Sequence, residues 1–321
     1  MIPLVVRSPY YLDLFIVILI NAALAMTFVM MLRTGLISLG IAAFYGIGAY
    51  ASAELVMKLH ISFWLSLPIS AIIAALFGLI LGFPLIKNAG FTFVILTTVI
   101  GMLFVVAIGN IPALGGYNGI PSIPPPNPVK FPFLPVIDFS SRIQFFYLAL
   151  LLFIVVILII NAFYSAWTGR AWTAIGLNPR LAQSLGIDVF RYRLLAFVVA
   201  CGIAGLLGSF YAHYRAFIIP TAYTMFTTIY IQVYAILGGI EFATLGPIIG
   251  SVLMTFFPEL VRMTKELEPF FNGALLILLI IFLPKGLLSL FKYRPSLVRW
   301  CKNIFRLRKL FTASGSGKGG A

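Results

Sequence analysis

The chain has 321 residues, of which 62% are hydrophobic and only 9% are charged. Soluble domains carry about 25% charged residues, so this composition, with a mean hydropathy of +1.09, excludes a soluble globular enzyme and a disordered protein. We expect an integral membrane protein with most of its mass in the bilayer.

Long apolar windows without charged residues recur along the chain, and a helix needs about 20 such residues to cross a membrane. A β-barrel would alternate apolar and polar residues in stretches of about ten, whereas the run IVVILII at 154–160 is apolar throughout. The predicted fold class is therefore all-α, a polytopic integral membrane protein with eight to ten transmembrane helices. The windows cover residues 14–32, 34–53, 61–86, 88–129, 143–169, 194–214, 216–240, 242–258 and 269–284.

Lys and Arg outnumber Asp and Glu by 22 to 8, which gives a formal net charge of +14. In membrane proteins this excess collects in cytoplasmic loops, and no soluble domain is expected that could bind a nucleic acid. The basic clusters lie in the loop 167–193 and in the segment 292–321, so both are predicted to be cytoplasmic. We expect a transmembrane domain at 1–291 and a basic, flexible cytoplasmic tail at 292–321.

Counting spans back from the loop 167–193 predicts the sides of the earlier segments. The segment 110–142 falls outside, and we expect a covering loop there, because Pro blocks helices and non-helical backbone cannot face lipid. The same count places Lys58 outside, Arg33 inside and the N-terminus outside. If the window 34–53 is instead a re-entrant or broken element, the N-terminus lies inside.

The loop 167–193 carries the signals of a short helix. Asn178 is a favoured N-cap residue, and Pro179 then falls at the first helical position, where its missing N–H costs nothing. Gly186 fits the left-handed position just past a helix end. Apolar residues between them share a face by i, i+4 spacing, namely Leu181, Ala182 and Leu185. A two-turn helix is marginal alone, so it either docks a cytoplasmic protein or packs on its own membrane domain.

Motifs over about 250 residues resemble, in the same order, those of branched-chain amino-acid permeases of the LivM type, the membrane subunits of ABC importers. They are TGLISLGIAAFYGIGAY at 34–50, NAGFTFVILT at 88–97, GGYNGIPSIP at 115–124, GRAW at 169–172 followed by LGI and RY, YAHY at 211–214, LGG at 237–239, LGPIIG at 245–250, PELVR at 258–262 and FLPKGL at 282–287.

The resemblance implies an importer-permease bundle, multi-pass in the inner (cytoplasmic) membrane of a bacterium. Such a permease pairs with a second homologous permease and receives its substrate from an external substrate-binding protein. Two ABC ATPase subunits bind and hydrolyse ATP, so this chain would not be an enzyme and would need no cofactor or metal of its own.

The same resemblance makes the short helix a coupling element that lies in a groove of the ATPase. The implied coupling residues are Asn178, Pro179, Arg180, Leu181, Ala182, Gln183, Leu185, Gly186 and Ile187. The family usually has acidic residues near the positions of Leu177, Pro179 and Gln183, and this chain has none before Asp188. We therefore expect a cognate ATPase whose groove offers an acidic residue to Arg180.

Two glycine-rich segments are candidates for hinges or for the translocation path. Small residues let helices pack closely, and breaks in spans mark substrate paths, so both interpretations stay open. The candidates are Gly35, Ser38, Gly40, Tyr45, Gly46, Gly48, Gly238, Gly239, Glu241, Gly246, Pro247 and Gly250. Elsewhere, Glu54 and Lys58 are spaced for a helix-surface ion pair, and His213 is expected in the outer aromatic belt.

The function predicted from these features is that of the permease subunit of an ATP-driven importer for branched-chain or other hydrophobic amino acids. The same machine could carry urea or short amides. A stand-alone secondary transporter or channel would need titratable or ion-coordinating residues within the spans, and few occur. An intramembrane enzyme would need paired His, Asp or Glu residues, and the chain has only two His.

Overall fold

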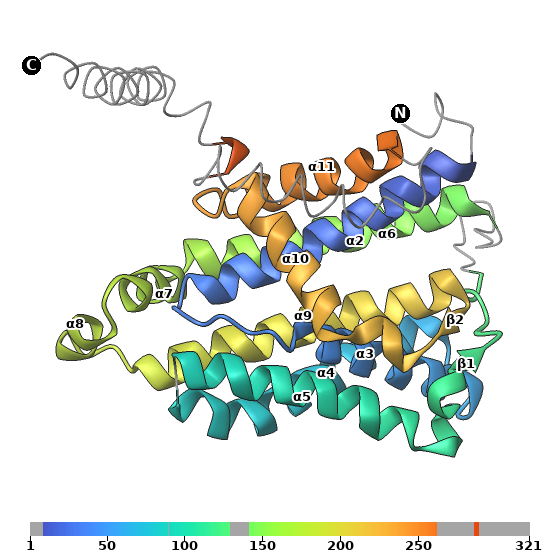
Figure 1. Ribbon diagram of the computed structural model, residues 1–321, viewed down its shortest axis with the longest axis horizontal. Coiled ribbons are helices and arrows are strands. Elements are labelled where there is room, and N and C mark those ends of the chain that lie inside the picture. The colour runs from blue at the N-terminus through green and yellow to red at the C-terminus, as the bar shows by residue number, and fades with distance from the viewer. Residues whose placement is uncertain (1–8, 89, 129–140, 262–285, 289–321) are drawn as a thin grey trace, which may run out of the picture.

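The computed structural model describes residues 9–88, 90–128, 141–261 and 286–288. These residues form a helical bundle with one two-residue antiparallel ladder at one end (Figure 1), which confirms the predicted all-α class. The helices are α2 (Pro9–Leu32), α3 (Ile41–Met57), α4 (Phe63–Lys87), α5 (Phe91–Gly109), α6 (Arg142–Ser165), α7 (Trp167–Leu177), α8 (Pro179–Ser184), α9 (Val189–Arg215), α10 (Met225–Gly238) and α11 (Leu245–Val261). The strands are β1 (Ile120–Pro121) and β2 (Phe217–Ile218), and the 3₁₀ turns are η1 (Pro112–Leu114), η2 (Gly116–Asn118) and η3 (Pro220–Tyr223).

Five helices are long and apolar enough to cross a membrane, namely α2, α4, α5, α6 and α9. Three shorter apolar helices, α3, α10 and α11, account for three further windows of the sequence. The predicted count of eight to ten spans stays a prediction, because the window 269–284, like the tail 292–321, lies outside the described residues.

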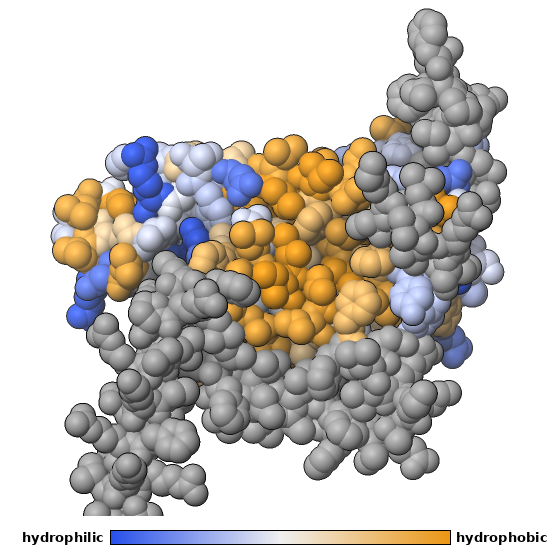
Figure 2. Space-filling model, turned by 90° about the horizontal axis from the view of Figure 1, so that it is seen from above, coloured by the Kyte–Doolittle hydropathy of each residue, from blue (hydrophilic) through white to orange (hydrophobic). Residues whose placement is uncertain are grey.

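The surface has the distribution of hydrophobic and hydrophilic residues that a membrane-spanning bundle needs. Figure 2 shows hydrophobic side chains gathered over the middle of the molecule and hydrophilic ones toward its two ends, with several at the end formed by α7 and α8. Many apolar side chains of α4 and α5 are exposed along their whole length, which suits contact with lipid or with another apolar protein surface.

Contacts at the two ends of the bundle confirm the predicted sides relative to one another. The guanidinium of Arg33 lies over the ring of Tyr164, 4.4 Å from its centroid, where α6 turns into α7. At the opposite end, the Lys58 ammonium donates to the carbonyl of Ala113 in the loop after α5 at 2.8 Å. Lys58 also forms the predicted ion pair with Glu54, at 2.6 Å. If the loop 167–193 is cytoplasmic, helix α2 therefore begins on the outer side.

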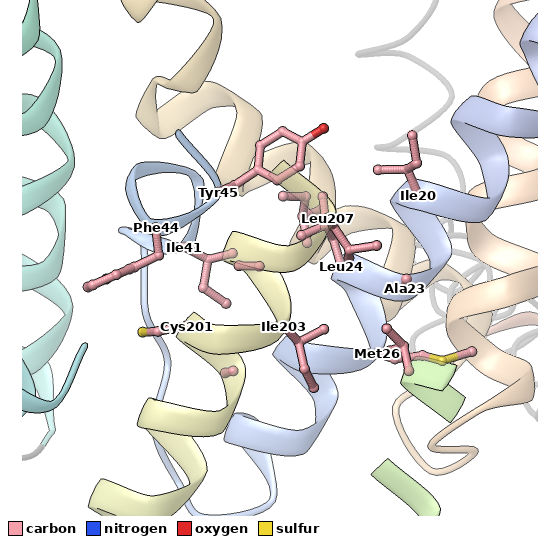
Figure 3. Packing of buried hydrophobic residues seen from close by; sticks show 14 of the residues in the cluster. Ile20, Ala23, Leu24, Met26, Ile41, Phe44, Tyr45, Cys201, Ile203 and Leu207 are labelled. Atoms are coloured by element: carbon pink, nitrogen blue, oxygen red, sulfur yellow. The ribbon is translucent and has the colours of Figure 1, made fainter. Parts of the chain in front are cut away.

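The core lies around α9, against which α2 and α3 both pack (Figure 3). Its side chains are apolar and nearly inaccessible, and they include Ile20, Ala23, Leu24 and Met26 of α2, Ile41, Phe44 and Tyr45 of α3, and Cys201, Ile203 and Leu207 of α9. Helices α3 and α9 approach so closely that a Cβ on Gly48 would overlap the carbonyl of Gly205. The small residues of the window 34–53 thus serve close packing in the half that forms α3.

Candidate functional site

Two of the apolar spans are broken. Helices α3 and α10 have 17 and 14 residues. At a rise of 1.5 Å per residue these lengths correspond to about 25 and 21 Å, less than the roughly 30 Å of a hydrocarbon core. Each is reached through chain that is not α-helical: residues 33–40 lead to α3 from the α7 end, and 216–224, which include β2 and η3, lead to α10 (Figure 1). The broken spans therefore enter the bundle from opposite sides.

The first break is held against α5 by backbone and hydroxyl groups. The Thr97 hydroxyl accepts a hydrogen bond from the main-chain N–H of Leu39 at 3.1 Å, and the Ser38 hydroxyl accepts from the N–H of Gly40 at 3.2 Å. A Cβ on Gly40 would overlap the Thr97 carbonyl, so glycine is needed at this approach. These bonds satisfy main-chain donors that have no partner in a helix.

The second broken span supplies the remaining partners of the first. The side-chain amide of Gln232 donates to the carbonyl of Ser38 at 2.9 Å, and the Thr228 hydroxyl accepts from the N–H of Ala42 at 3.1 Å. Both Ser38 and Thr228 are fully buried. The starts of α3 and α10 are therefore joined by side chains, and a displacement of one break must change the bonds of the other.

A cluster of aromatic rings fills the bundle between this junction and the outer loop. The ring of Tyr223 in η3 lies 5.4 Å from Tyr45 and 6.3 Å from both Tyr50 and Phe104, measured between centroids. All four rings are nearly inaccessible. The hydroxyls of Tyr50 and Tyr223 have no hydrogen-bond partner among the described residues, so the cluster is held by packing.

The coupling loop forms the predicted short helix, α8. The side-chain oxygen of Asn178 accepts from the N–H groups of Arg180 and Leu181, both at 3.1 Å, and Pro179 occupies the first helical position. Gly186 follows the helix with a φ of 83°, in the left-handed region. In Figure 1, α8 projects beyond α7 at one end of the bundle.

The three apolar residues of α8 do not share one environment, so that prediction is wrong in part. Leu181 and Leu185 remain 60% and 73% exposed. Ala182, which lies one residue and about 100° further round the helix than Leu181, is buried against Ile175 and Val189. Ala182 thus anchors α8 to its own loop, and Leu181 and Leu185 are left exposed.

The family model that describes the branched-chain amino acid transport system / permease component matches residues 10–283. This chain belongs to that permease family. The high-affinity branched-chain amino acid transport system permease protein LivM of Escherichia coli strain K12 is 32% identical over 284 residues, which cover 82% of this chain and 66% of the relative. The LivM protein of Salmonella typhimurium gives the same identity and the same shares.

A third relative is the probable branched-chain amino acid transport permease protein LivH of Methanocaldococcus jannaschii, 28% identical over 223 residues, 67% of this chain and 68% of the relative. The permease spans slightly less than two thirds of the length of the two LivM proteins. No solved structure matches it.

The candidate path residues of the permease fall into two separate groups. Those of the first segment surround the first break: Gly35 lies in its turn with a φ of 75°, Ser38 and Gly40 form its bonds, and Tyr45, Gly46 and Gly48 follow in α3.

Those of the second segment pack α10 against α11. A Cβ on Gly238 would overlap the Gly246 carbonyl, and a Cβ on Gly250 would overlap the Tyr234 carbonyl. Pro247 is buried in the first turn of α11, and Glu241 is exposed in the turn 239–244 between the helices.

His213 of the permease is not a belt residue, which corrects the prediction. Its side chain is 2% exposed, with Nε2 2.9 Å from the Ser52 hydroxyl and Nδ1 2.7 Å from the Pro124 carbonyl. Because a carbonyl only accepts, Nδ1 donates to Pro124, and Nε2 of the neutral ring accepts from Ser52. The hydroxyls of Ser66 and Ser209 complete the cluster at 3.0 and 2.8 Å from that of Ser52. The tyrosines beside His213 in the sequence favoured a place in the aromatic belt. The residues that bury His213 come instead from α3, α4 and the outer loop, which are distant in the sequence.

Other polar residues of the permease that hold the breaks were also missed from sequence. They are Thr97, Thr228, Gln232 and Arg193. The signal in the sequence was weak: an isolated polar residue within an apolar span indicates a functional or structural bond by default. Within the described ranges, no group of three or more His, Cys, Asp or Glu residues could hold a metal ion.

Proposed function

We propose that this chain is the transmembrane permease subunit of an ATP-driven importer for branched-chain or other hydrophobic amino acids, in the cytoplasmic membrane of a bacterium. The observation that carries the proposal is the capped helix α8, which projects from an apolar, broken-span bundle with its leucines uncovered. Membership of the branched-chain amino acid permease family supports the transport role and the class of cargo.

The exposed face of α8 fits a cytoplasmic partner. Leu177, Leu181 and Leu185 are 83%, 60% and 73% exposed, although they belong to a segment outside the spans. A six-residue helix has little stability of its own, and neighbouring exposed leucines are typical of a protein interface. An ABC ATPase that binds this face would take Asn178 to Ile187 into its groove and would hydrolyse the ATP that drives transport.

The broken span gives the proposed position of the translocation path. Ile37 lies in the non-helical stretch before α3 and is 42% exposed in the isolated chain. Non-helical backbone at membrane depth is tolerated only when it is buried in protein or lines a water-filled cavity. A second, homologous permease that faces this stretch would supply the cover, and the similarity of this chain to both LivM and LivH proteins supports a pair.

The outer loop is the proposed meeting point with an external substrate-binding protein. Residues 110–128 form η1, η2 and β1 at the end of the bundle opposite α8. The cargo named for the relatives is branched-chain amino acids, which favours these over urea or short amides as the substrate.

The test is a pull-down of the tagged chain from detergent-solubilised native membranes, with mass spectrometry of the proteins recovered. We expect a second permease and an ATPase, and a binding protein that responds to leucine but not to urea. Recovery of the chain alone or as a homo-oligomer, under conditions that keep a known importer intact, would overturn the proposal in favour of a stand-alone transporter. A response to urea alone would overturn only the cargo.

Matched variants locate the ATPase contact. Leu181→Asp should release the ATPase and leave the second permease bound, because the charge lies on the exposed face of α8. Leu59→Asp is the control, since Leu59 is 65% exposed but lies at the opposite end of the bundle. Arg180→Glu should weaken the complex if the groove is acidic. Retention of the ATPase by Leu181→Asp would exclude α8 as the contact.

A further inference from the structure

The turn that opens the first break is held by the loop that carries α8. The guanidinium Nε of Arg193, in the first turns of α9, donates to the carbonyl of Thr34 at 3.0 Å. Its Nη2 lies beside Gly35, where a Cβ would stand 3.3 Å from it. Gly35 has a φ of 75°, a conformation that glycine adopts without strain. The turn between α2 and the non-helical stretch 36–40 is thus shaped around this arginine.

A second contact reaches the same turn from the other side. Gly176, near the end of α7, lies so close to the turn that a Cβ on it would overlap the carbonyl of Arg33. The side chain of Arg33 covers the ring of Tyr164 at the end of α6. The residues Arg33–Gly35 are therefore clamped between the two ends of the coupling loop, α7 and α9.

The coupling loop itself is built as one body. Ala182 of α8 packs against Ile175 of α7 and Val189 of α9, which ties the three helices together. The carboxylate of Asp188 caps α9 by accepting from the N–H of Arg191 at 3.0 Å, and Trp172 of α7 donates its indole N–H to the carbonyl of Tyr192 at 2.9 Å. A displacement of α8 by a bound partner is therefore expected to carry the start of α9, and Arg193 with it.

The side chains of Arg193 and its neighbour Arg191 contact different kinds of group. Arg191 pairs with Asp188 at 2.9 Å on the surface, with its side chain 84% exposed. Arg193 is half-buried, takes part in no ion pair within the described part of the chain, and donates a hydrogen bond to the main chain of the broken segment. That pattern indicates an arginine that holds backbone in position.

The far end of the same segment carries the junction with α5 and α10. Seven residues, from Thr34 to Gly40, connect the Arg193 bond with the bonds of Ser38 to Gln232 and of Leu39 to Thr97. Thr34 and Gly35 lie in a turn, and the residues from Leu36 to Gly40 are non-helical. A displacement of Thr34 therefore acts through a short stretch of chain on the groups that hold the break.

We propose that Arg193 is a positioning residue that links movement of the coupling loop to the broken segment 34–40, and so couples the ATPase to the path. The inference rests on the proposed function, because it requires an ATPase on α8. It assigns the linkage to one hydrogen bond, between Arg193 and the Thr34 carbonyl, rather than to the loop as a whole.

The test uses the full complex in proteoliposomes with Arg193→Gln, Arg193→Lys and the control Arg191→Gln. Couplings between sites typically correspond to a factor of about 5 to 150, so we expect Arg193→Gln to lower transport per ATP hydrolysed by roughly tenfold. The ATPase should stay bound and hydrolyse ATP at a rate within about twofold of the unaltered complex. Arg191→Gln should behave as the unaltered complex, and Arg193→Lys should be intermediate, because a lysine provides a donor without the fixed geometry of the guanidinium.

A conformational readout separates positioning from general damage. In a background with Cys201 and Cys301 replaced by Ala, Ile37→Cys reports the exposure of the broken segment to a membrane-impermeant maleimide. We expect ATP with vanadate to change the labelling rate when Arg193 is present and to leave it unchanged with Arg193→Gln. An ATP-dependent change that persists with Arg193→Gln, together with unchanged transport per ATP, would overturn the proposal.

Two further outcomes are decisive. If the unaltered chain binds no ATPase and shows no ATP-dependent labelling, the proposed function itself fails, and this inference with it. If only Arg193→Gln fails to assemble, Arg193→Lys decides the matter: reduced coupling in the assembled complex supports the role of Arg193, and coupling equal to that of the unaltered complex excludes it.

Discussion

The side-chain amide of Gln232 donates a hydrogen bond to the carbonyl of Ser38 at 2.9 Å, joining two broken spans 194 residues apart in the sequence. The two breaks lie in segments that enter the bundle from opposite ends (Figure 1), and side chains of α10 supply hydrogen-bond partners for main-chain groups at the first break. A transporter needs a place where helices can rearrange without exposing backbone to lipid, and this junction has the required composition.

Replacing Gln232 by Leu should destabilise the chain. The substitution keeps the volume but leaves the Ser38 carbonyl without its donor, at a cost of about 1–3 kcal/mol for a buried group. The thermal unfolding midpoint in detergent should fall, and transport should fall with it. Tyr230→Phe is the control, because Tyr230 lies on the same helix and is 46% exposed. Equal midpoints for the two variants would show that the Gln232 bond contributes nothing.

The sequence predicted the helical class, the placement of Arg33 and Lys58 at opposite ends and the cap of α8, because these depend on local chemistry. Nine apolar windows identify spans without any knowledge of neighbours, and Asn178 with Pro179 specify a helix start by themselves. The break before α3 was left open, since Gly40 is compatible with both a packed helix and a broken one. Whether the span is broken before α3 depends on hydrogen bonds to Thr97 and Gln232, which lie far away in the sequence.

The environment of single polar residues was the least predictable part. His213 stands among tyrosines in the sequence, which favours an interfacial position, yet it is buried by serines from α3 and α4 and by the outer loop. Ala182 and Leu181 are adjacent, and helix rotation alone sends one inward and the other outward. Such differences depend on tertiary packing, which apolar periodicity within one helix does not encode.

The close approach of α3 and α9 gives a second prediction, for Gly48→Ala. The added methyl group would overlap the Gly205 carbonyl, and forcing extra atoms into a packed interface typically costs about 1–3 kcal/mol. Gly202→Ala in α9, which faces α4, is the control, because its Cβ would lie 3.4 Å from the nearest atom, in ordinary contact. The unfolding midpoint should fall for Gly48→Ala and stay nearly unchanged for Gly202→Ala; the reverse order would contradict the packing described.

Removing a phenol hydroxyl should have opposite effects at two tyrosines. The buried Tyr223 hydroxyl has no partner among the described residues, so Tyr223→Phe should leave stability unchanged or raise it. The Tyr214 hydroxyl donates to the carboxylate of Asp13, which joins α9 to α2. Hydrogen bonds to charged groups contribute about 1.5–3 kcal/mol, so Tyr214→Phe should lower the unfolding midpoint. A loss at Tyr223 equal to that at Tyr214 would indicate a partner for the Tyr223 hydroxyl.

His213 should hold the outer loop against the bundle, and His213→Phe tests this. Phenylalanine can keep the edge-to-face packing of the His213 ring on Phe63, whose centroid lies 4.8 Å away, but it cannot donate to the Pro124 carbonyl or accept from Ser52. Each buried group left unpaired costs about 1–3 kcal/mol, and the loop 110–128 should become easier to cleave from outside by a protease.

The control for His213→Phe is His60→Asn. His60 is exposed and has a φ of 52°, a conformation that Asn tolerates better than most residues, so this variant should be cleaved at the rate of the unaltered chain. Limited proteolysis of sealed vesicles oriented with the loop outward measures both variants. Faster cleavage with His213→Phe alone would support the role of His213 in holding the loop. Equal cleavage of both variants would show that the β1–β2 pairing of Ile120 with Ile218 suffices without the histidine.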